Sequence, residues 1–324
     1  MARARWRLPT CGRVVSSASA EASAARQAGW STQAPAKVNL SLRISGVRPD
    51  GYHLLRTVLQ SIALADVLTL RPHDGPFALD CDTIGLPTDA TNLAWTGAAA
   101  MAAALGVPLD GWRLQLRKFV PSAGGLGGGS ADAAAAARLV AHAHGAVMSA
   151  GQLAEVVRPI GADVAYFAYG GTAQGEGVGD VLSPLADAPD AAVVIVRPPF
   201  GVPTPQAYRW YDEASSLTED SYISRSQPGL VAWGNDLEAP VAARHPEIRA
   251  IVDRLRESGA RLAAMSGSGS ACFGLFPPTA SLDRLEAGWP VGTRVWRTRL
   301  LSREAYADAV RCIAAPASHS NSDS

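Results

Sequence analysis

The chain has no excess of charge, no cysteine pattern and no long apolar run. Its 324 residues carry 29 basic and 29 acidic side chains, so no overall field would attract nucleic acid or an anionic membrane. The four cysteines, Cys11, Cys81, Cys272 and Cys312, show neither disulfide nor metal-site spacing and suit a reducing compartment. No apolar stretch is long enough to span a bilayer. These features predict a cytoplasmic protein with small-molecule partners, and neither a nucleic acid nor a membrane as partner.

Lysine is also scarce. Of the 29 basic residues only two are lysine, Lys37 and Lys118. An arginine-rich chain keeps lysine either by chance or where a compact point charge is needed. Both lysines lie in segments that carry other chemical signals, so the second interpretation has to be considered for each.

The length suffices for two domains, each with its own core. Residues 1–33 are rich in Ala, Arg and Ser without a clear period, and we expect a disordered tail or an over-long gene start rather than a transit peptide. After them, strand-like and helix-like segments alternate. Proline-rich stretches place a domain junction near residue 185, which gives domains 34–185 and 186–314 and a disordered tail 315–324.

The most informative motif is a run of five glycines in six positions, within Pro121-Ser-Ala-Gly-Gly-Leu-Gly-Gly-Gly-Ser-Ala131. A strand pattern over 112–120 precedes it and a helix pattern over 131–147 follows. A glycine turn into a helix N-terminus presents backbone N–H groups to an anion. A flexible surface loop is the alternative, although such loops usually have polar flanks. No Lys-Ser/Thr follows the last glycine and the spacing does not fit Gly-x-Gly-x-x-Gly, so a different class of nucleotide loop is indicated.

Residues 36–44 alternate polar and apolar side chains, which places Lys37 and Asn39 on one face of a strand. Such a pattern commonly means a strand with its polar side in solvent. A site for charge transfer would also use an isolated lysine beside an asparagine. A turn carrying Tyr52 and His53 follows at once.

Two further segments each allow a structural and a functional interpretation. Asp163 stands at the expected start of an apolar helix, where a carboxylate either complements the helix dipole or accepts a proton. The loop Met265-Ser-Gly-Ser-Gly269 follows a helix pattern that ends near Leu262 and precedes an apolar strand. It is either a tight turn or part of a ligand site between the two domains.

Taken together, these segments resemble the GHMP kinases, named for galactokinase, homoserine kinase, mevalonate kinase and phosphomevalonate kinase. The resemblance extends from about Ala34 to Ala314. In chain order it comprises Pro-Ala-Lys-Val-Asn-Leu from Pro35, Asp-Gly-Tyr-His from Asp50, Thr-Asn-Leu from Thr91, the glycine loop, Gly-Ala-Asp-Val from Gly161, Gly-Glu-Gly-Val-Gly-Asp-Val-Leu from Gly175, and Met-Ser-Gly-Ser-Gly from Met265.

The resemblance implies an α+β fold of two domains, the first similar to domain 2 of ribosomal protein S5 and the second ferredoxin-like, with the active site between them. It implies an ATP-dependent kinase that uses Mg²⁺ and is a monomer or weak homodimer. The segments around Lys37 and Tyr52 are most similar to members that phosphorylate the 2-hydroxyl of a cytidine diphosphate-linked methylerythritol in non-mevalonate isoprenoid biosynthesis. A homoserine- or mevalonate-type kinase, or a non-catalytic binding protein of this fold, remains an alternative.

The resemblance also implies roles for individual residues. Asp163 matches the family's general base and Lys37 its partner. The residues expected to bind ATP are Lys118, Pro121, Ser122, Ala123, Gly124, Gly125, Leu126, Gly127, Gly128, Gly129, Ser130 and Ala131. Those expected to bind the acceptor substrate are Asn39, Tyr52, His53, Thr204 and Tyr208. No metal ligand is identified. Relatives often have a larger residue at 122 and glycine at 123, so we expect the ATP affinity to differ from theirs.

Overall fold

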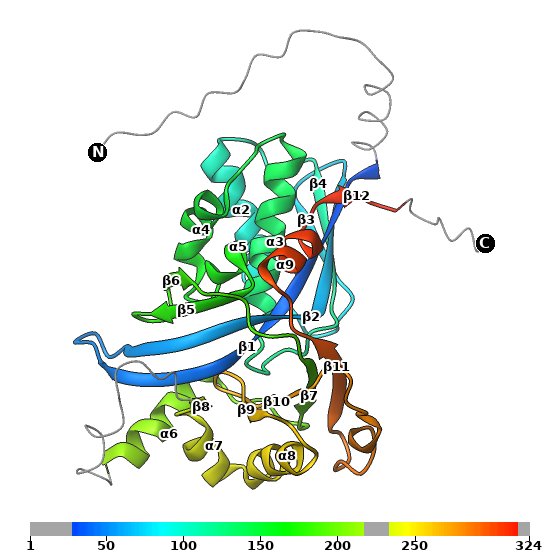
Figure 1. Cartoon of the computed structure of the whole chain (residues 1–324). Coiled ribbons are helices and arrows are strands. Elements are labelled where there is room, and N and C mark those ends of the chain that lie inside the picture. The colour runs from blue at the N-terminus through cyan, green and yellow to red at the C-terminus, as the bar shows by residue number, and fades with distance from the viewer. Residues whose placement is uncertain (1–27, 217–232, 317–324) are drawn as a thin grey trace.

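The structure, a computed structural model, describes residues 28–216 and 233–316. Within these residues the chain forms one eight-stranded and one four-stranded sheet. Figure 1 shows the larger sheet with one group of helices above it and the smaller sheet with a second group below. This agrees with the two-domain α+β fold that the sequence predicts.

A long antiparallel pair, β1 (Trp30–Val47) and β2 (His53–Pro72), forms the frame of the larger sheet. The first half of β2 pairs with β5 (Thr172–Glu176), and its second half pairs with β4 (Trp112–Arg117). The shorter strands β3 (Ala78–Cys81) and β6 (Val181–Pro184) extend the sheet. Three register shifts interrupt the β1–β2 pairing. Because such irregularities bend a strand, the pair can serve both halves of the molecule.

Helices α2 (Leu93–Leu105), α3 (Gly128–Ala143), α4 (Ala150–Val157) and α5 (Tyr166–Tyr169), with the short 3₁₀ turn η1 (Arg158–Ile160), pack with this sheet around an alanine-rich core. The structure places the start of α3 three residues before the predicted one, because Gly127 adopts a left-handed conformation and Gly128 and Gly129 are helical. The helix ends four residues early, where Gly145 turns the chain. No helix in residues 28–216 or 233–316 has the length and apolarity to cross a bilayer.

The smaller sheet has the order β11 (Arg294–Arg299), β7 (Ala192–Arg197), β10 (Cys272–Phe276), β9 (Leu262–Met265). Helices α6 (Thr204–Ser216), α7 (Glu238–Arg244) and α8 (Pro246–Glu257) and the 3₁₀ turn η2 (Asp283–Leu285) belong to the same half. Strand β7 is apolar from Ala192 to Val196 because both of its faces are buried at residues 193–196. Val194 and Val196 belong to the core with α8, whereas Val193 and Ile195 face the larger sheet.

The end of the chain returns to the first domain. Strand β12 (Ile313–Ala314) pairs with the start of β1, and α9 (Arg303–Ala309) packs beside β1. The predicted second domain of residues 186–314 thus includes a final segment that lies with the first domain. The short strand β8 (Gly234–Asn235) likewise pairs with β1. Strand β1 begins at Trp30, inside the predicted extension 1–33; residues 1–27 and 317–324 lie outside the described residues.

Helices α2 and α3 approach each other closely at Gly97. A methyl group at this position would stand 2.1 Å from the Ala133 carbonyl oxygen, which belongs to the backbone of α3. Since backbone cannot move aside as a side chain can, only glycine fits without separating the two helices.

We therefore expect Gly97→Ala to destabilise the protein by about 1–3 kcal/mol through overpacking. Gly151→Ala is the matched control, since Gly151 lies in α4 with no atom closer than 3.7 Å to the added methyl. Alanine favours a helix, so this control should be neutral or stabilising. Urea unfolding of both variants measures the effect, and equal free energies of unfolding would contradict the close approach.

Candidate active site

Lys37 and Asp163 lie together, 126 residues apart in the sequence. The Lys37 Nζ atom is 3.4 Å from Asp163 Oδ2. Lys37 is only 3% exposed, whereas the Asp163 side chain is 39% exposed. The ammonium also donates to Asn39 Oδ1 at 2.6 Å. The common interpretation of the alternating pattern would place the polar face of β1 in solvent. In the structure this face is instead buried around an ion pair.

The amide nitrogen of Asn39 holds this side chain in one orientation. Its amide Nδ2 donates to Thr57 Oγ1 at 2.8 Å, and the Thr57 hydroxyl donates to the Ser41 carbonyl at 2.7 Å. This chain of bonds fixes the amide oxygen as the atom that faces Lys37. Asp163 itself lies in a turn, because α5 begins only at Tyr166; the expected helix start at Asp163 is wrong.

The glycine loop enters α3 through positive φ angles. Gly125 and Gly127 have φ of 73° and 69°, and Ala123 has φ of 54° without being glycine. An added methyl group on Gly127 would stand 2.8 Å from the Phe167 ring and 3.1 Å from Lys37 Cγ. Glycine is thus required both by conformation and by the approach of the loop to Lys37. The first N–H groups of α3 have no partner inside the helix and are directed to the region in front of it.

The glycine-serine loop at residues 265–269 belongs to the smaller domain and packs against the glycine loop of the larger one. Ser266 Oγ donates to the Gly125 carbonyl at 2.9 Å and accepts from the Asn39 N–H at 3.3 Å. The structure corrects its setting, because α8 ends at Glu257 and the loop joins strands β9 and β10. The loop therefore brings the second domain against both the glycine loop and β1.

The other end of the site carries aromatic side chains. Tyr52 is 66% exposed in the turn between β1 and β2. The His53 and Tyr208 rings are stacked with centroids 4.7 Å apart, and His53 Nε2 is 2.7 Å from Asp212 Oδ1. Burial, followed by the negative charge of Asp163, raises the pKa of the Tyr208 phenol, so it stays a neutral hydroxyl. The hydroxyl groups of Thr204 and Ser268 form a hydrogen bond, with their oxygen atoms 3.0 Å apart.

One cavity of about 1100 Å³ joins these parts. Every residue predicted to bind ATP, substrate or a proton lines it, apart from Ala131. Ala131 is buried in the core of the first domain, and its N–H donates to the Gly127 carbonyl inside the helix. The cavity is also lined by charged residues to which the sequence assigned no role, namely Asp50, Asp132, Arg158, Asp180, Arg209 and Asp212.

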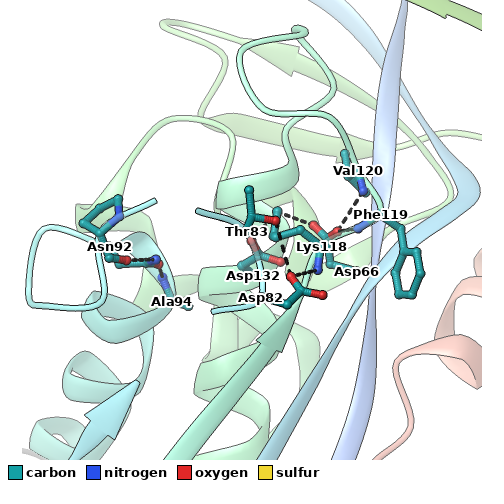
Figure 2. A network of polar contacts seen from close by, with 10 residues as sticks. Asp66, Asp82, Thr83, Asn92, Ala94, Lys118, Phe119, Val120 and Asp132 are labelled. Atoms are coloured by element: carbon teal, nitrogen blue, oxygen red, sulfur yellow. Dashed lines mark hydrogen bonds and ion pairs between the residues drawn. The ribbon is translucent and has the colours of Figure 1, made fainter. Parts of the chain in front are cut away.

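Lys118 takes part in a buried cluster of charges at the edge of the cavity (Figure 2). Its Nζ atom forms ion pairs with Asp66 Oδ2 and, at 2.7 Å, with Asp132 Oδ2. Burial raises the pKa of Asp132; the Lys118 ammonium opposes this shift and the Asp66 charge adds to it. Asp132 is the fifth residue of α3 and Asp66 stands in the apolar strand β2, and the sequence gives no sign of a partner for either.

We expect Asp132→Asn to change how stability depends on pH. The pKa of Asp132 in the folded protein lies above the 3.8 of a free carboxyl, so folding retains a proton that the unfolded chain has lost. This contribution to stability is fully present below about pH 4 and is lost as the pH rises from there through the raised pKa of Asp132 in the folded protein. Urea unfolding across this window should show a shallower decline in the variant, and parallel declines would contradict the raised pKa.

Comparison of the chain with known proteins shows to which family it belongs. The model for the N-terminal domain of GHMP kinases matches residues 92–171, and that for the C-terminal domain matches residues 222–290. The chain is 40% identical over 250 residues to 4-diphosphocytidyl-2-C-methyl-D-erythritol kinase of Moorella thermoacetica, which covers 74% of this chain and 87% of the relative. It is 35% identical to the enzyme of the same name from Geobacillus thermodenitrificans, over 80% and 92% of the two chains.

A solved structure agrees. The crystal structure of a 4-(cytidine 5'-diphospho)-2C-methyl-D-erythritol kinase superimposes with a TM-score of 0.67 at 34% identity and covers 83% of this chain and 98% of its own. Identity at this level over nearly the whole length of the relatives shows the family that the ordered motifs predicted. The chain belongs to the GHMP kinases and, within them, to the 4-diphosphocytidyl-2-C-methyl-D-erythritol kinase family.

Proposed function

We propose that the protein transfers the γ-phosphoryl group of ATP to the 2-hydroxyl of 4-diphosphocytidyl-2-C-methyl-D-erythritol, a step of isoprenoid precursor synthesis. The observation that carries this proposal is the position of the Lys37–Asp163 pair. It lies in one cavity between the glycine loop and the aromatic residues Tyr52, His53 and Tyr208. A phosphate donor at the loop and an acceptor whose cytosine lies at the aromatic end would meet, through the acceptor's hydroxyl, at the ion pair.

Asp163 would accept the proton of the attacking hydroxyl. Phosphoryl transfer passes through a loose transition state, so the nucleophile needs little prior deprotonation and a carboxylate can take the proton late. Asp163 is the more exposed partner and can meet a substrate, whereas Lys37 is buried and fixed by Asn39. Lys37 would offset charge that builds up on the transferred group.

The glycine loop would hold the phosphates of ATP through its backbone N–H groups and the positive end of α3. The residues of 28–216 and 233–316 form no group of three His, Cys, Asp or Glu side chains that could hold a metal ion. A Mg²⁺ ion would be held mainly by the phosphate oxygens of the nucleotide, as is usual for kinases. When bound, the ion would neutralise part of the phosphate charge.

The acceptor would bind with its cytosine at the opposite end. Tyr52 offers an exposed ring face, and His53 and Tyr208 form the wall beside it. Thr204 begins α6 on the same side of the cavity, and Asn39 lies next to the reacting end. An assay that couples ADP formation to the cytidine diphosphate substrate tests the proposal. Preference for homoserine or mevalonate as acceptor, or ATP binding without transfer, would overturn it.

We expect Asp163→Asn to lower kcat by roughly 10²- to 10³-fold, because an amide cannot accept the proton or balance Lys37. The KM for the cytidine substrate should change little, since the aromatic end is untouched. Asp74→Asn is the control, because Asp74 is exposed and does not line the cavity. Normal turnover by Asp163→Asn would remove this residue from the role of base.

We expect Tyr52→Ala mainly to raise the KM for the cytidine substrate, because stacking of a base on an aromatic ring is worth roughly 1–3 kcal/mol. Tyr52→Phe keeps the ring and should retain the wild-type KM. Steady-state kinetics at saturating ATP separates KM from kcat. An unchanged KM in the alanine variant would place the cytosine elsewhere in the cavity.

A further inference from the structure

Lys118 and Asp132 stand at the two ends of the glycine loop. Lys118 directly follows β4, three residues before Pro121, and Asp132 is the fifth residue of α3. The ion pair between them therefore closes the loop at its base, across 14 residues of sequence. The Lys118 ammonium would also stand 3.4 Å from a methyl group added to Gly128, so it lies against the first residue of the helix.

Asp66 on β2 anchors the entry to the loop. Its Oδ1 atom accepts the backbone N–H groups of Phe119 and Val120, at 2.6 and 2.8 Å, and its Oδ2 atom accepts from the Lys118 ammonium. These contacts appear together in Figure 2. A carboxylate that accepts three donors from consecutive residues holds that segment in one conformation. The loop is thus tied to the sheet at its entry and to the helix at its exit.

Lys118 is poorly placed to bind phosphate itself. Its side chain is 7% exposed, and two of its three N–H groups are engaged by buried carboxylates. The cluster contains two carboxylates for one ammonium, and Asp132 Oδ1 is buried without a hydrogen-bond partner among the described residues. A surplus negative charge beside a phosphate site disfavours an anionic ligand. The position of Asp132 is therefore better explained by geometry than by attraction for the ligand.

We propose that Asp66, Lys118 and Asp132 form a neck clamp that holds the glycine loop in the shape that receives ATP, and that Lys118 is a positioning residue rather than a phosphate ligand. The inference rests on the proposed function in one respect, that the loop binds ATP. It changes the role predicted for Lys118 from direct contact to action through the backbone of the loop.

The clamp and simple electrostatics predict opposite results for Asp132→Ala. The variant removes a negative charge near the phosphates and releases the Lys118 ammonium, so a direct role of Lys118 would leave ATP affinity unchanged or tighten it. The clamp predicts weaker binding, by about tenfold, because one charge-assisted hydrogen bond that closes the loop is lost. Asp132→Asn keeps an oxygen that accepts from Lys118 and should bind ATP with nearly wild-type affinity.

Calorimetric titration of the full-length protein with ATP and with the cytidine substrate tests this inference. Asp80→Ala is the control, because it removes an exposed charge from strand β3, outside the cavity. Weaker ATP binding by Asp132→Ala alone, with unchanged binding of the cytidine substrate, supports the clamp. Equal or tighter ATP binding by Asp132→Ala, or equal weakening by Asp132→Asn, overturns it.

Two further results keep the test decisive. If the wild-type protein binds no ATP, the proposed function fails rather than the clamp alone. If Asp132→Ala does not fold, as judged by circular dichroism, Asp132→Ser replaces it, because a serine hydroxyl stops short of the ammonium. The same two outcomes then apply to the serine variant.

Discussion

The burial of both faces of β1 between residues 36 and 42 is the constraint on which the rest of the structure depends. Val38 and Leu40 pack against the smaller sheet, so the two domains share a core. Lys37 and Asn39 occupy the other face and are equally buried. A buried ammonium must be paired and hydrogen-bonded. The chain therefore has to bring a carboxylate to Lys37, and the loop that carries Asp163 does so. One face of β1 thus makes the contact between the domains, and the other face carries the lysine of the reactive pair.

Backbone contacts that only glycine allows bring the remaining parts to this strand. A methyl group on Gly125 would stand 2.0 Å from the Ser266 carbonyl oxygen, and one on Gly127 would meet Phe167 and Lys37. The glycines of the loop therefore do more than admit phosphate. They let the loop lie against the second domain and against β1 at once. A larger residue at 125 would push the loop away from the second domain, and one at 127 would push it away from β1.

The sequence predicted the two-domain α+β fold and the family, because the strand and helix patterns and the ordered motifs are local signals. It also named Lys37 and Asp163, but their meeting depends on the path of the chain between them, which no local pattern shows. Asp66 was missed because the sequence does not show that this acid in an apolar strand is fully buried, and Asp132 because an acid near the start of a helix is common. Asp212 lies on α6 and reaches His53 only through tertiary packing. The domain boundary near residue 185 stays a prediction, to which the structure adds that the last helix and strand return to the first domain.

Both lysines of this arginine-rich chain are buried beside carboxylates. An ammonium is compact and can rotate three donors toward separate acceptors, whereas a guanidinium is a flat group that needs acceptors in its plane. Lys37 must reach Asn39 on its own strand and Asp163 on a loop, and Lys118 must reach Asp66 and Asp132 from different elements. The acceptors of each lysine come from different directions in a confined space. Each lysine therefore stands where a small charge has to join separate parts of the site.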